Sequence, residues 1–249
     1  MLNPKILVRK DLNMPTGKIC AQVSHALMKM ILNLMTTNEK GQTTIQPMIY
    51  KQFSDWVKKG KPFDVVYEES DSEIEKTLSN LGTNRFFNII DQGRTVFKGK
   101  PTWTVTMIVP EELSSVPNAI IHKDDYGKLK SKQTILITTR PRRPTLTMAK
   151  ECANMSIMTL IDKIIPQNDG TGLFTLEESS PLSVWLTGSF GKIVLGTRKL
   201  ENLKIVEANA KNACIEHHSS YTKDNAGVIA LGPDYPEEIN LLTSNYKPL

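Results

Sequence analysis

Apolar residues near the start of the chain follow two different spacings. Residues 5–11 form a short run rich in apolar side chains, which is typical of a buried β-strand. The segment after it repeats apolar residues every three or four positions, as one face of an amphipathic helix requires. These residues are Ile19, Val23, Ala26, Leu27, Met30, Ile31 and Leu34. The pattern predicts a strand that leads directly into a helix beginning at Lys18.

The same spacings predict the elements that follow. Short β-rich runs indicate strands, and helical spacing with Ser72 and Glu75 arranged as a capping box indicates a helix. The expected strands are 63–67, 86–91 and 104–109, and the expected helices are 72–81 and 200–213. Two polar inserts rich in Thr, Asn and Gly, at 36–46 and 166–180, are expected to be exposed loops.

The second half of the chain repeats the order of features in the first half at a constant distance of 129 positions. A constant register across several elements indicates an internal duplication. The recurring features are Pro15-Thr16 and Pro144-Thr145, Trp56 and Trp185, and the apolar strands 5–8 and 134–137. We therefore expect two domains, residues 1–126 and 131–249, joined by a linker near 123–132.

Composition restricts the class of protein. No apolar run approaches the roughly 20 residues that span a bilayer, and the amino terminus does not resemble a secretory signal. The three cysteines Cys20, Cys152 and Cys214 lack disulfide or metal spacing, so we expect reduced thiols and a cytoplasmic location. The net charge of +5 lies mostly in residues 1–130, which favours a polyanionic partner there, although many solvated surfaces are equally basic.

Two motifs carry a family resemblance. Residues 17–26 read Gly-Lys-Ile-Cys-Ala-Gln-Val-Ser-His-Ala, and residues 86–95 read Phe-Phe-Asn-Ile-Ile-Asp-Gln-Gly-Arg-Thr. Both resemble, in the same order, motifs of the type 2 peptidyl-tRNA hydrolases. The resemblance implies two tandem three-layer α/β/α domains, each with a mixed four-stranded sheet. Because family members often form homodimers, it also implies that the two copies form an intramolecular pseudo-dimer.

The family's reaction is hydrolysis of the ester that joins a peptide to the 3′ end of tRNA. The resemblance implies a catalytic set of Lys18, Gln22, Asp91, Thr95 and Thr104. A positive charge at the start of a helix is disfavoured by the helix dipole. This position therefore favours a functional role for Lys18 over that of an ordinary surface lysine. Asp91 is expected to orient or deprotonate the attacking water or to pair with Lys18, and its alternative role is to cap the turn that follows. Both threonines are otherwise ordinary strand formers.

The remaining candidates bind substrate. Asp11 and Gln22 flank the same site and are expected to hold the substrate or Lys18 in place. His25 is a further candidate, with a packing or capping role as its alternative. Basic side chains are expected to contact tRNA phosphates, with a solvated basic surface as the alternative. The substrate-binding set is Asp11, Arg94, Gly93, His25, Arg9, Lys10, Lys98 and Lys100.

The second copy departs from this pattern. At the 129-residue offset Lys18 becomes Thr147, Gln22 becomes Glu151 and Asp11 becomes Arg140. We expect this copy to stabilise the first copy or to extend the tRNA surface, without hydrolysing a substrate. Adjacent strand residues point to opposite faces, so His217 and His218 do not favour a shared metal ion. No metal and no cofactor are expected.

Three functions remain open at this point. The first is a peptidyl-tRNA hydrolase with one active site, in the first copy. The alternative is a non-catalytic pseudoenzyme of the same fold that binds tRNA or another protein. The third is an esterase for another acylated nucleotide or small molecule, which the sequence does not separate from the first. No membrane is expected as a partner.

Overall fold

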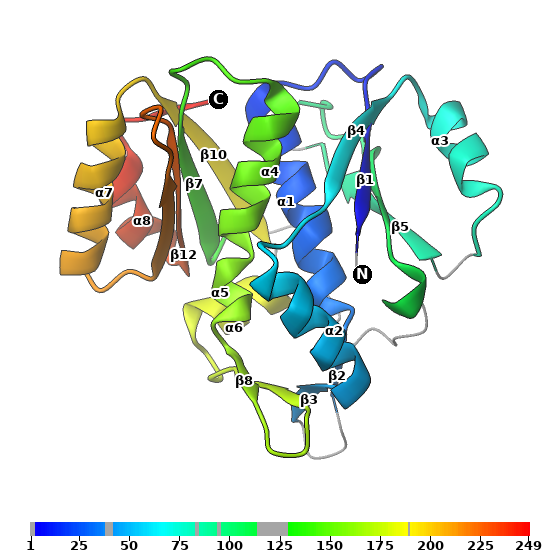
Figure 1. The fold of residues 1–249 in the computed structure, drawn as a ribbon. Coiled ribbons are helices and arrows are strands. Elements are labelled where there is room, and N and C mark those ends of the chain that lie inside the picture. The colour runs from blue at the N-terminus through cyan, green and yellow to red at the C-terminus, as the bar shows by residue number, and fades with distance from the viewer. Residues whose placement is uncertain (1–2, 38–41, 83–84, 94–95, 114–128, 189) are drawn as a thin grey trace. The chain divides into compact units, whose positions relative to one another are not determined.

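A computed structural model describes residues 3–37, 42–82, 85–93, 96–113, 129–188 and 190–249 (Figure 1). The chain is a mixed α/β protein with two compact units, which are not the two contiguous halves. The first unit contains Met1–Pro15, His25–Ala119 and Ile165–Phe174, and the second contains Thr16–Ser24, Ile120–Ile164 and Thr175–Leu249. The first half of the chain therefore contributes Thr16–Ser24 to the second unit, and the second half contributes Ile165–Phe174 to the first unit.

The first unit contains the mixed four-stranded sheet that the sequence predicts. Its inner strand at Lys5–Arg9 pairs in parallel with one neighbour and antiparallel with the other. The strand order is β4 (Asp64–Glu68), β1 (Lys5–Arg9), β6 (Thr102–Ile108) and β5 (Phe86–Asp91). All four strands lie close to their predicted positions.

Helix α3 (Asp71–Leu78) covers one face of this sheet. Its apolar side chains Ile74 and Leu78 pack against Leu7 of β1. The neighbours of Leu7 in the strand, Ile6 and Val8, point to the other face and are fully buried as well. Both faces of β1 are therefore covered, which explains its continuous apolar sequence.

The predicted capping box of helix α3 is wrong by two residues. The cap is Ser70, whose hydroxyl accepts the Glu73 N–H at 3.4 Å, and the helix ends at Leu78 before the predicted limit of 81. The same serine-to-acid spacing occurs twice in this stretch, at Ser70 with Glu73 and at Ser72 with Glu75. Spacing alone does not distinguish the two, whereas the chain turns out of β4 at Ser70.

The second unit has a five-stranded mixed sheet. Its order is β11 (His217–Tyr221), β12 (Gly227–Asp234), β7 (Lys132–Thr138), β10 (Gly191–Thr197) and β13 (Lys247–Pro248). Strand β7 pairs in parallel with β10 and antiparallel with β12, as β1 does with β4 and β6. The predicted four-stranded sheet therefore has one additional edge strand here, and Lys132, which the predicted linker includes, begins a strand.

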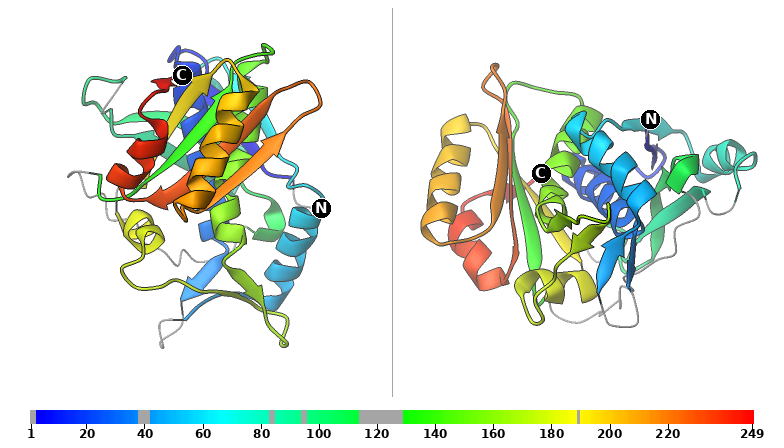
Figure 2. Two further views of the ribbon diagram at one scale, coloured as in Figure 1. Left: turned by 90° about the vertical axis from the view of Figure 1, so that its left-hand side faces the viewer. Right: turned by 60° about the horizontal axis from the view of Figure 1, so that its bottom comes forward.

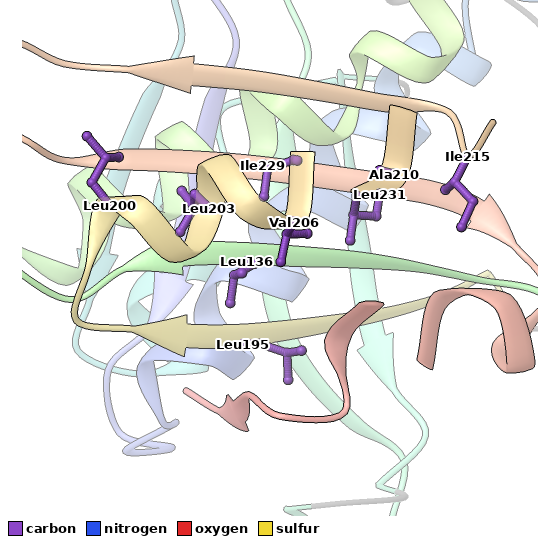
Figure 3. Packing of buried hydrophobic residues seen from close by; sticks show 9 residues of the cluster. All are labelled: Leu136, Leu195, Leu200, Leu203, Val206, Ala210, Ile215, Ile229 and Leu231. Atoms are coloured by element: carbon purple, nitrogen blue, oxygen red, sulfur yellow. The ribbon is translucent and has the colours of Figure 1, made fainter. Parts of the chain in front are cut away.

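Helices lie on both faces of this second sheet (Figures 1 and 2). On one face α7 (Leu200–Asn212) lies beside α8 (Pro236–Thr243), and on the other lies α4 (Thr145–Ser156). The α7 face forms one apolar cluster, because the strand residues that point toward it are leucine and isoleucine (Figure 3). Its members are Leu136, Leu195, Leu200, Leu203, Val206, Ala210, Ile215, Ile229 and Leu231.

The remaining helices range from a single turn to 17 residues in length. They are α1 (Thr16–Leu32), α2 (Pro47–Lys58), the 3-10 turn η2 (Glu111–Leu113), α5 (Met158–Ile161) and α6 (Pro181–Thr187). Helix α1 begins two residues before its predicted start. Within the described ranges, none of the helices is long and apolar enough to cross a bilayer.

The two polar inserts contain strands, so the prediction of exposed loops is wrong. Strands β2 (Met35–Thr37) and β3 (Thr43–Ile45) lie almost entirely in the first insert. Strand β9 (Gly172–Phe174) lies in the second insert, and β8 (Ile164–Pro166) ends at the first residue of that insert. They form one sheet in the order β2-β3-β9-β8, and β3 pairs antiparallel with β9. Threonine and isoleucine favour strands, but β3 and its partner β9 are more than 100 residues apart, and the local sequence pattern does not reveal their pairing.

Each unit also holds one buried tryptophan in the same local arrangement. The indole N–H of Trp56 donates to the Pro62 carbonyl at 2.7 Å, and that of Trp185 donates to the Gly191 carbonyl at 2.9 Å. Both donors are at most 1% exposed, and both acceptors lie six residues further along the chain. Each bond connects a helix to the start of the next strand.

The three cysteines differ in environment, and we expect them to differ in reactivity. Cys20 and Cys152 are fully buried, whereas Cys214 is exposed. A hydrogen bond with Cys20, together with burial, raises the pKa of the Cys152 thiol well above its ordinary value. Because the thiolate is the reactive form, native protein should react with a disulfide reagent such as dithionitrobenzoate at one thiol.

Absorbance of the released thionitrobenzoate counts these thiols directly. We expect one fast equivalent from native protein and three after denaturation in guanidinium. The variant Cys214→Ser should abolish the fast phase and keep the other two. Two or more fast equivalents from native protein would contradict the buried positions of Cys20 and Cys152.

Candidate active site

Asp91 ends strand β5 and begins a tight turn. Its side chain is 9% exposed, and its Oδ1 accepts the backbone N–H of Gly93 at 2.8 Å. An aspartate that accepts the N–H two residues further on is a common turn-forming arrangement. The structure therefore shows the turn contact that the sequence predicts as the alternative role of Asp91.

Gly93 has the backbone conformation and the close packing that only glycine tolerates. Its φ angle is +77°, and a Cβ at this position would lie 2.6 Å from both the backbone N and O of Lys100. The Gly93 carbonyl also accepts the Gly99 N–H at 2.9 Å, which holds Gly99, and with it the adjacent Lys98 and Lys100, close to Gly93. Gly93 thus has a structural role in addition to the substrate contact predicted from sequence.

Replacing Gly93 with alanine should disrupt this close packing. The added methyl group would overlap the Lys100 backbone, and φ above zero is strained for alanine, so we expect a loss of about 1–3 kcal/mol in the free energy of unfolding. Thermal unfolding measures the loss. The control Gly99→Ala tests the conformation alone, because that glycine has φ of +79° but open space around it. Equal effects of the two substitutions would contradict the close packing at Gly93.

Thr104 lies at an irregularity in strand β6. Ile89 pairs with Val105 and Ile90 pairs with Trp103, so Thr104 is the additional residue of a β-bulge. Its hydroxyl is fully buried and donates to the Ile89 carbonyl at 3.1 Å. The sequence predicts the strand and the threonine but not the bulge, which places Thr104 beside the strand that ends in Asp91.

Asp11 and Arg9 form an ion pair just after strand β1. The Arg9 Nε donates to Asp11 Oδ1 at 3.1 Å, and Arg9 Nη1 lies 3.2 Å from a carboxylate oxygen of Asp71. The hydrogen bond from Arg9 lowers the pKa of Asp11, and the same bond raises the pKa of Arg9. Arg9 therefore contacts a tRNA phosphate only if it gives up part of this arrangement.

Sequence reasoning missed Asp71 as a partner of Arg9. A signal was available: strands β1 and β4 are parallel, so the residues that follow them meet at one edge of the sheet. Asp71 follows β4 closely, as Asp11 follows β1. The pairing of the two strands predicts the meeting of the two carboxylates around Arg9.

Lys18 and Gln22 lie one turn apart on helix α1, in the part that belongs to the second unit. Lys18 is half-buried and Gln22 is 4% exposed. The helix begins at Thr16, so Lys18 lies in its first turn, which contains no acidic residue. His25 follows on the same helix, is half-buried, and belongs to the first unit.

The other basic candidates are at the surface. The exposed Lys10 ammonium lies 2.6 Å from a carboxylate oxygen of Glu69, and Lys98 and Lys100 are exposed close to Gly93. Exposed ion pairs contribute little to stability, so Lys10 can exchange Glu69 for a phosphate at small cost. Arg94 and Thr95, which were predicted to bind and to catalyse, lie outside the described residues.

The second half has a different set of contacts at the corresponding positions. Glu151, which replaces Gln22, forms an ion pair with Arg143, and Arg143 also donates to the Thr138 hydroxyl at 3.0 Å. Thr147, which replaces Lys18, is exposed. An internal ion pair therefore occupies the position that corresponds to Gln22.

The histidines of the second half have protein partners. His217 Nδ1 lies 2.9 Å from the Ile215 carbonyl, and His218 lies within 3.7 Å of carboxylate oxygens of Asp162 and Glu216. In the parts of the chain that the structure describes, no three or more His, Cys, Asp or Glu side chains gather as a metal site would need.

Comparison with known proteins identifies the family. The family model "Peptidyl-tRNA hydrolase PTH2" matches residues 3–123. The peptidyl-tRNA hydrolase of Saccharolobus solfataricus is 32% identical over 98 residues, which cover 38% of this chain and 75% of that protein. The one from Sulfurisphaera tokodaii is 35% identical over 71 residues, covering 28% of this chain and 53% of that protein. The chain, matched over its first half, therefore belongs to the type 2 peptidyl-tRNA hydrolase family, as its motifs predict.

Proposed function

We propose that this chain is a peptidyl-tRNA hydrolase that cleaves the ester between a peptide and the 3′ end of tRNA. The observation that carries the proposal is the position of the family match. Residues 3–123 contain every predicted catalytic residue, and the second half replaces Lys18 and Gln22 with Thr147 and Glu151. The chain accordingly has one active site, formed by residues of the matched segment. Because the substrate arises in translation, we place the activity in the cytoplasm.

Ester hydrolysis needs a base for the attacking water and a positive group for the developing oxyanion. We assign the base to Asp91, which is buried and whose Oδ1 accepts the Gly93 N–H. We assign the oxyanion to the Lys18 ammonium. Gln22, one turn further along α1, orients the substrate or the Lys18 side chain.

The two threonines are assigned to water and substrate positioning. The Thr104 hydroxyl donates its proton to the Ile89 carbonyl, so toward a water or a substrate N–H it acts as an acceptor. Thr95 is assigned by its motif position alone. We assign contacts with the tRNA phosphates to the basic residues Arg94, Arg9, Lys10, Lys98 and Lys100. Asp11 and His25 are assigned to substrate binding beside Lys18.

We further propose that residues 1–126 and 131–249 are tandem copies that form an intramolecular pseudo-dimer. Both principal sheets have the same order of parallel and antiparallel neighbours, which supports the duplication. Lys5 pairs with Asp64, and Thr134 pairs with Ile193, so both members of the second pair are 129 residues further on. The second copy keeps the fold while losing the catalytic side chains.

Two contacts support a two-fold relation between the copies. In the β3–β9 pairing, Thr44 lies opposite Leu173, its own counterpart 129 positions later. The hydroxyl oxygens of Thr16 and Thr145, again 129 positions apart, lie 3.4 Å from each other. A residue meets its own counterpart where a two-fold axis passes, as at the centre of an isologous dimer interface.

Turnover separates the hydrolase from the alternatives. Three esters should be compared at equal concentration: an N-acetylated aminoacyl-tRNA, the same aminoacyl-tRNA with a free amine, and a small acyl ester. The proposal predicts release of free tRNA chiefly from the N-acetylated substrate. Salt-sensitive tRNA binding without release would favour the pseudoenzyme, and preference for the small ester would favour a different esterase.

A further inference from the structure

The first turn of helix α1 is capped from outside by the segment Lys247–Leu249. The Gly17 N–H donates to the Leu249 carbonyl at 3.0 Å. The first N–H groups of a helix have no partner within the helix, and the residue before α1 is Pro15, whose side chain cannot accept a hydrogen bond. The Leu249 carbonyl therefore supplies the acceptor that a serine or aspartate cap usually supplies.

The contact leaves no space for any side chain at Gly17. A Cβ on Gly17 would lie 2.2 Å from the Leu249 oxygen and 3.0 Å from its carbonyl carbon. Both are backbone atoms, so a larger residue at this position has to displace the whole segment. The close approach of Leu249 thus explains why this chain has glycine at position 17 of the Gly-Lys motif.

Leu249 is itself held firmly. Strand β13 pairs with β10, with Pro248 opposite Leu195 and Lys247 opposite Gly196. The Leu249 N–H donates to the Val194 carbonyl at 3.1 Å. Its side chain lies over Gly196, where a Cβ would come within 3.0 Å of Leu249 Cδ1. The carbonyl that caps α1 is therefore fixed to the sheet of the second unit.

The neighbouring residue of α1 has a contact on this unit as well. The Thr16 hydroxyl lies 3.4 Å from that of Thr145, at the start of α4. Thr16 and Gly17 both precede Lys18, the residue that we assign to the oxyanion. Their two contacts come from residues of the second half of the chain, Thr145 and Leu249.

We propose that Leu249 is a positioning residue for Lys18, and that the second copy contributes to catalysis by holding the first turn of α1. This inference rests on the proposed hydrolase function. It gives the second copy a use that needs no catalytic side chain of its own. The effect expected from losing the contact is on kcat, because a small displacement of a charged group from the reacting carbonyl weakens transition-state stabilisation.

The variant Gly17→Ala tests the contact with Leu249, because the contact and the helix propensity of alanine predict opposite effects. Alanine is the better helix former, so without Leu249 the substitution should favour the helix. With Leu249 present, we expect kcat for N-acetylated aminoacyl-tRNA to fall about tenfold or more, while KM changes less than about twofold. Gly82→Ala is the matched control, because the nearest atom to a Cβ there is 4.0 Å away.

A chain that lacks Lys247–Leu249 allows the two changes to be compared singly and together. We expect its kcat to fall as in Gly17→Ala, and the further substitution Gly17→Ala in the shortened chain to cause no additional loss. Normal kcat in the shortened chain, with Lys18→Ala still inactive, would overturn the inference and leave the hydrolase standing. Additive losses in the double variant would also overturn it. No turnover by the wild type would overturn the proposed function and this inference with it.

Discussion

Replacing Asp91 with asparagine should reduce kcat for peptidyl-tRNA by about 10²–10⁴-fold, the range typical of losing a general base. Asparagine has the same shape, and its amide oxygen can still accept the Gly93 N–H that Asp91 Oδ1 accepts at 2.8 Å. The turn should therefore survive, while the negative charge that deprotonates water is lost. Thermal unfolding should match the wild type, and the rate of tRNA release should not.

The chain offers a matched control for this substitution. Asp169 Oδ1 accepts the Thr171 N–H at 2.9 Å, also two residues further on, in the hairpin between β8 and β9. Asp169→Asn changes the same type of turn in the same way, and we expect normal kcat. Normal turnover by Asp91→Asn would contradict the role of base and leave Asp91 as a turn residue only.

Replacing Lys18 with alanine should have the second large effect. Loss of one group that stabilises an oxyanion typically reduces kcat by about 10²–10³-fold. The same change removes a cation from the first turn of α1, where the helix dipole disfavours it, so stability should stay equal or rise slightly. Activity and stability should thus move in opposite directions, as measured by tRNA release and thermal unfolding.

Thr147→Ala is the control for Lys18→Ala, because Thr147 occupies the position 129 residues later and is exposed. We expect no change in kcat from it. A large loss from Thr147→Ala would place a functional group in the second copy. Equal loss of stability and activity in Lys18→Ala would indicate that this lysine holds the helix instead of acting on the ester.

Much of the fold follows from local patterns. Strands β1, β4 and β5 and helix α7 lie close to their predicted limits, because each has a clear apolar spacing. The failures concern contacts between distant segments. Strand β9 pairs with β3, which lies more than 100 residues earlier in the chain, and the edge strand β13 is only two residues long. Neither has a periodic pattern of its own that could reveal it.

The motifs predict a set of candidate site residues, and they predict less about the arrangement of these residues. Lys18, Gln22, Asp91 and Thr104 are predicted from the motifs alone, and their roles remain predictions. The motifs do not reveal that Thr104 is the extra residue of a bulge, or that Arg9 is already bound by carboxylates. They also do not reveal the contact between Gly17 and Leu249, since it joins residues from opposite ends of the sequence.

We propose that this chain hydrolyses peptidyl-tRNA with Asp91 as the base. The most direct measurement is a single-turnover assay with N-acetylated aminoacyl-tRNA and excess protein, comparing the wild type with Asp91→Asn. Under these conditions the rate reports chemistry on bound substrate instead of binding or product release. We predict complete release of tRNA by the wild type and release at least about 100-fold slower by the variant, with equal tRNA binding. No release by the wild type, or equal rates for the two proteins, would contradict the account.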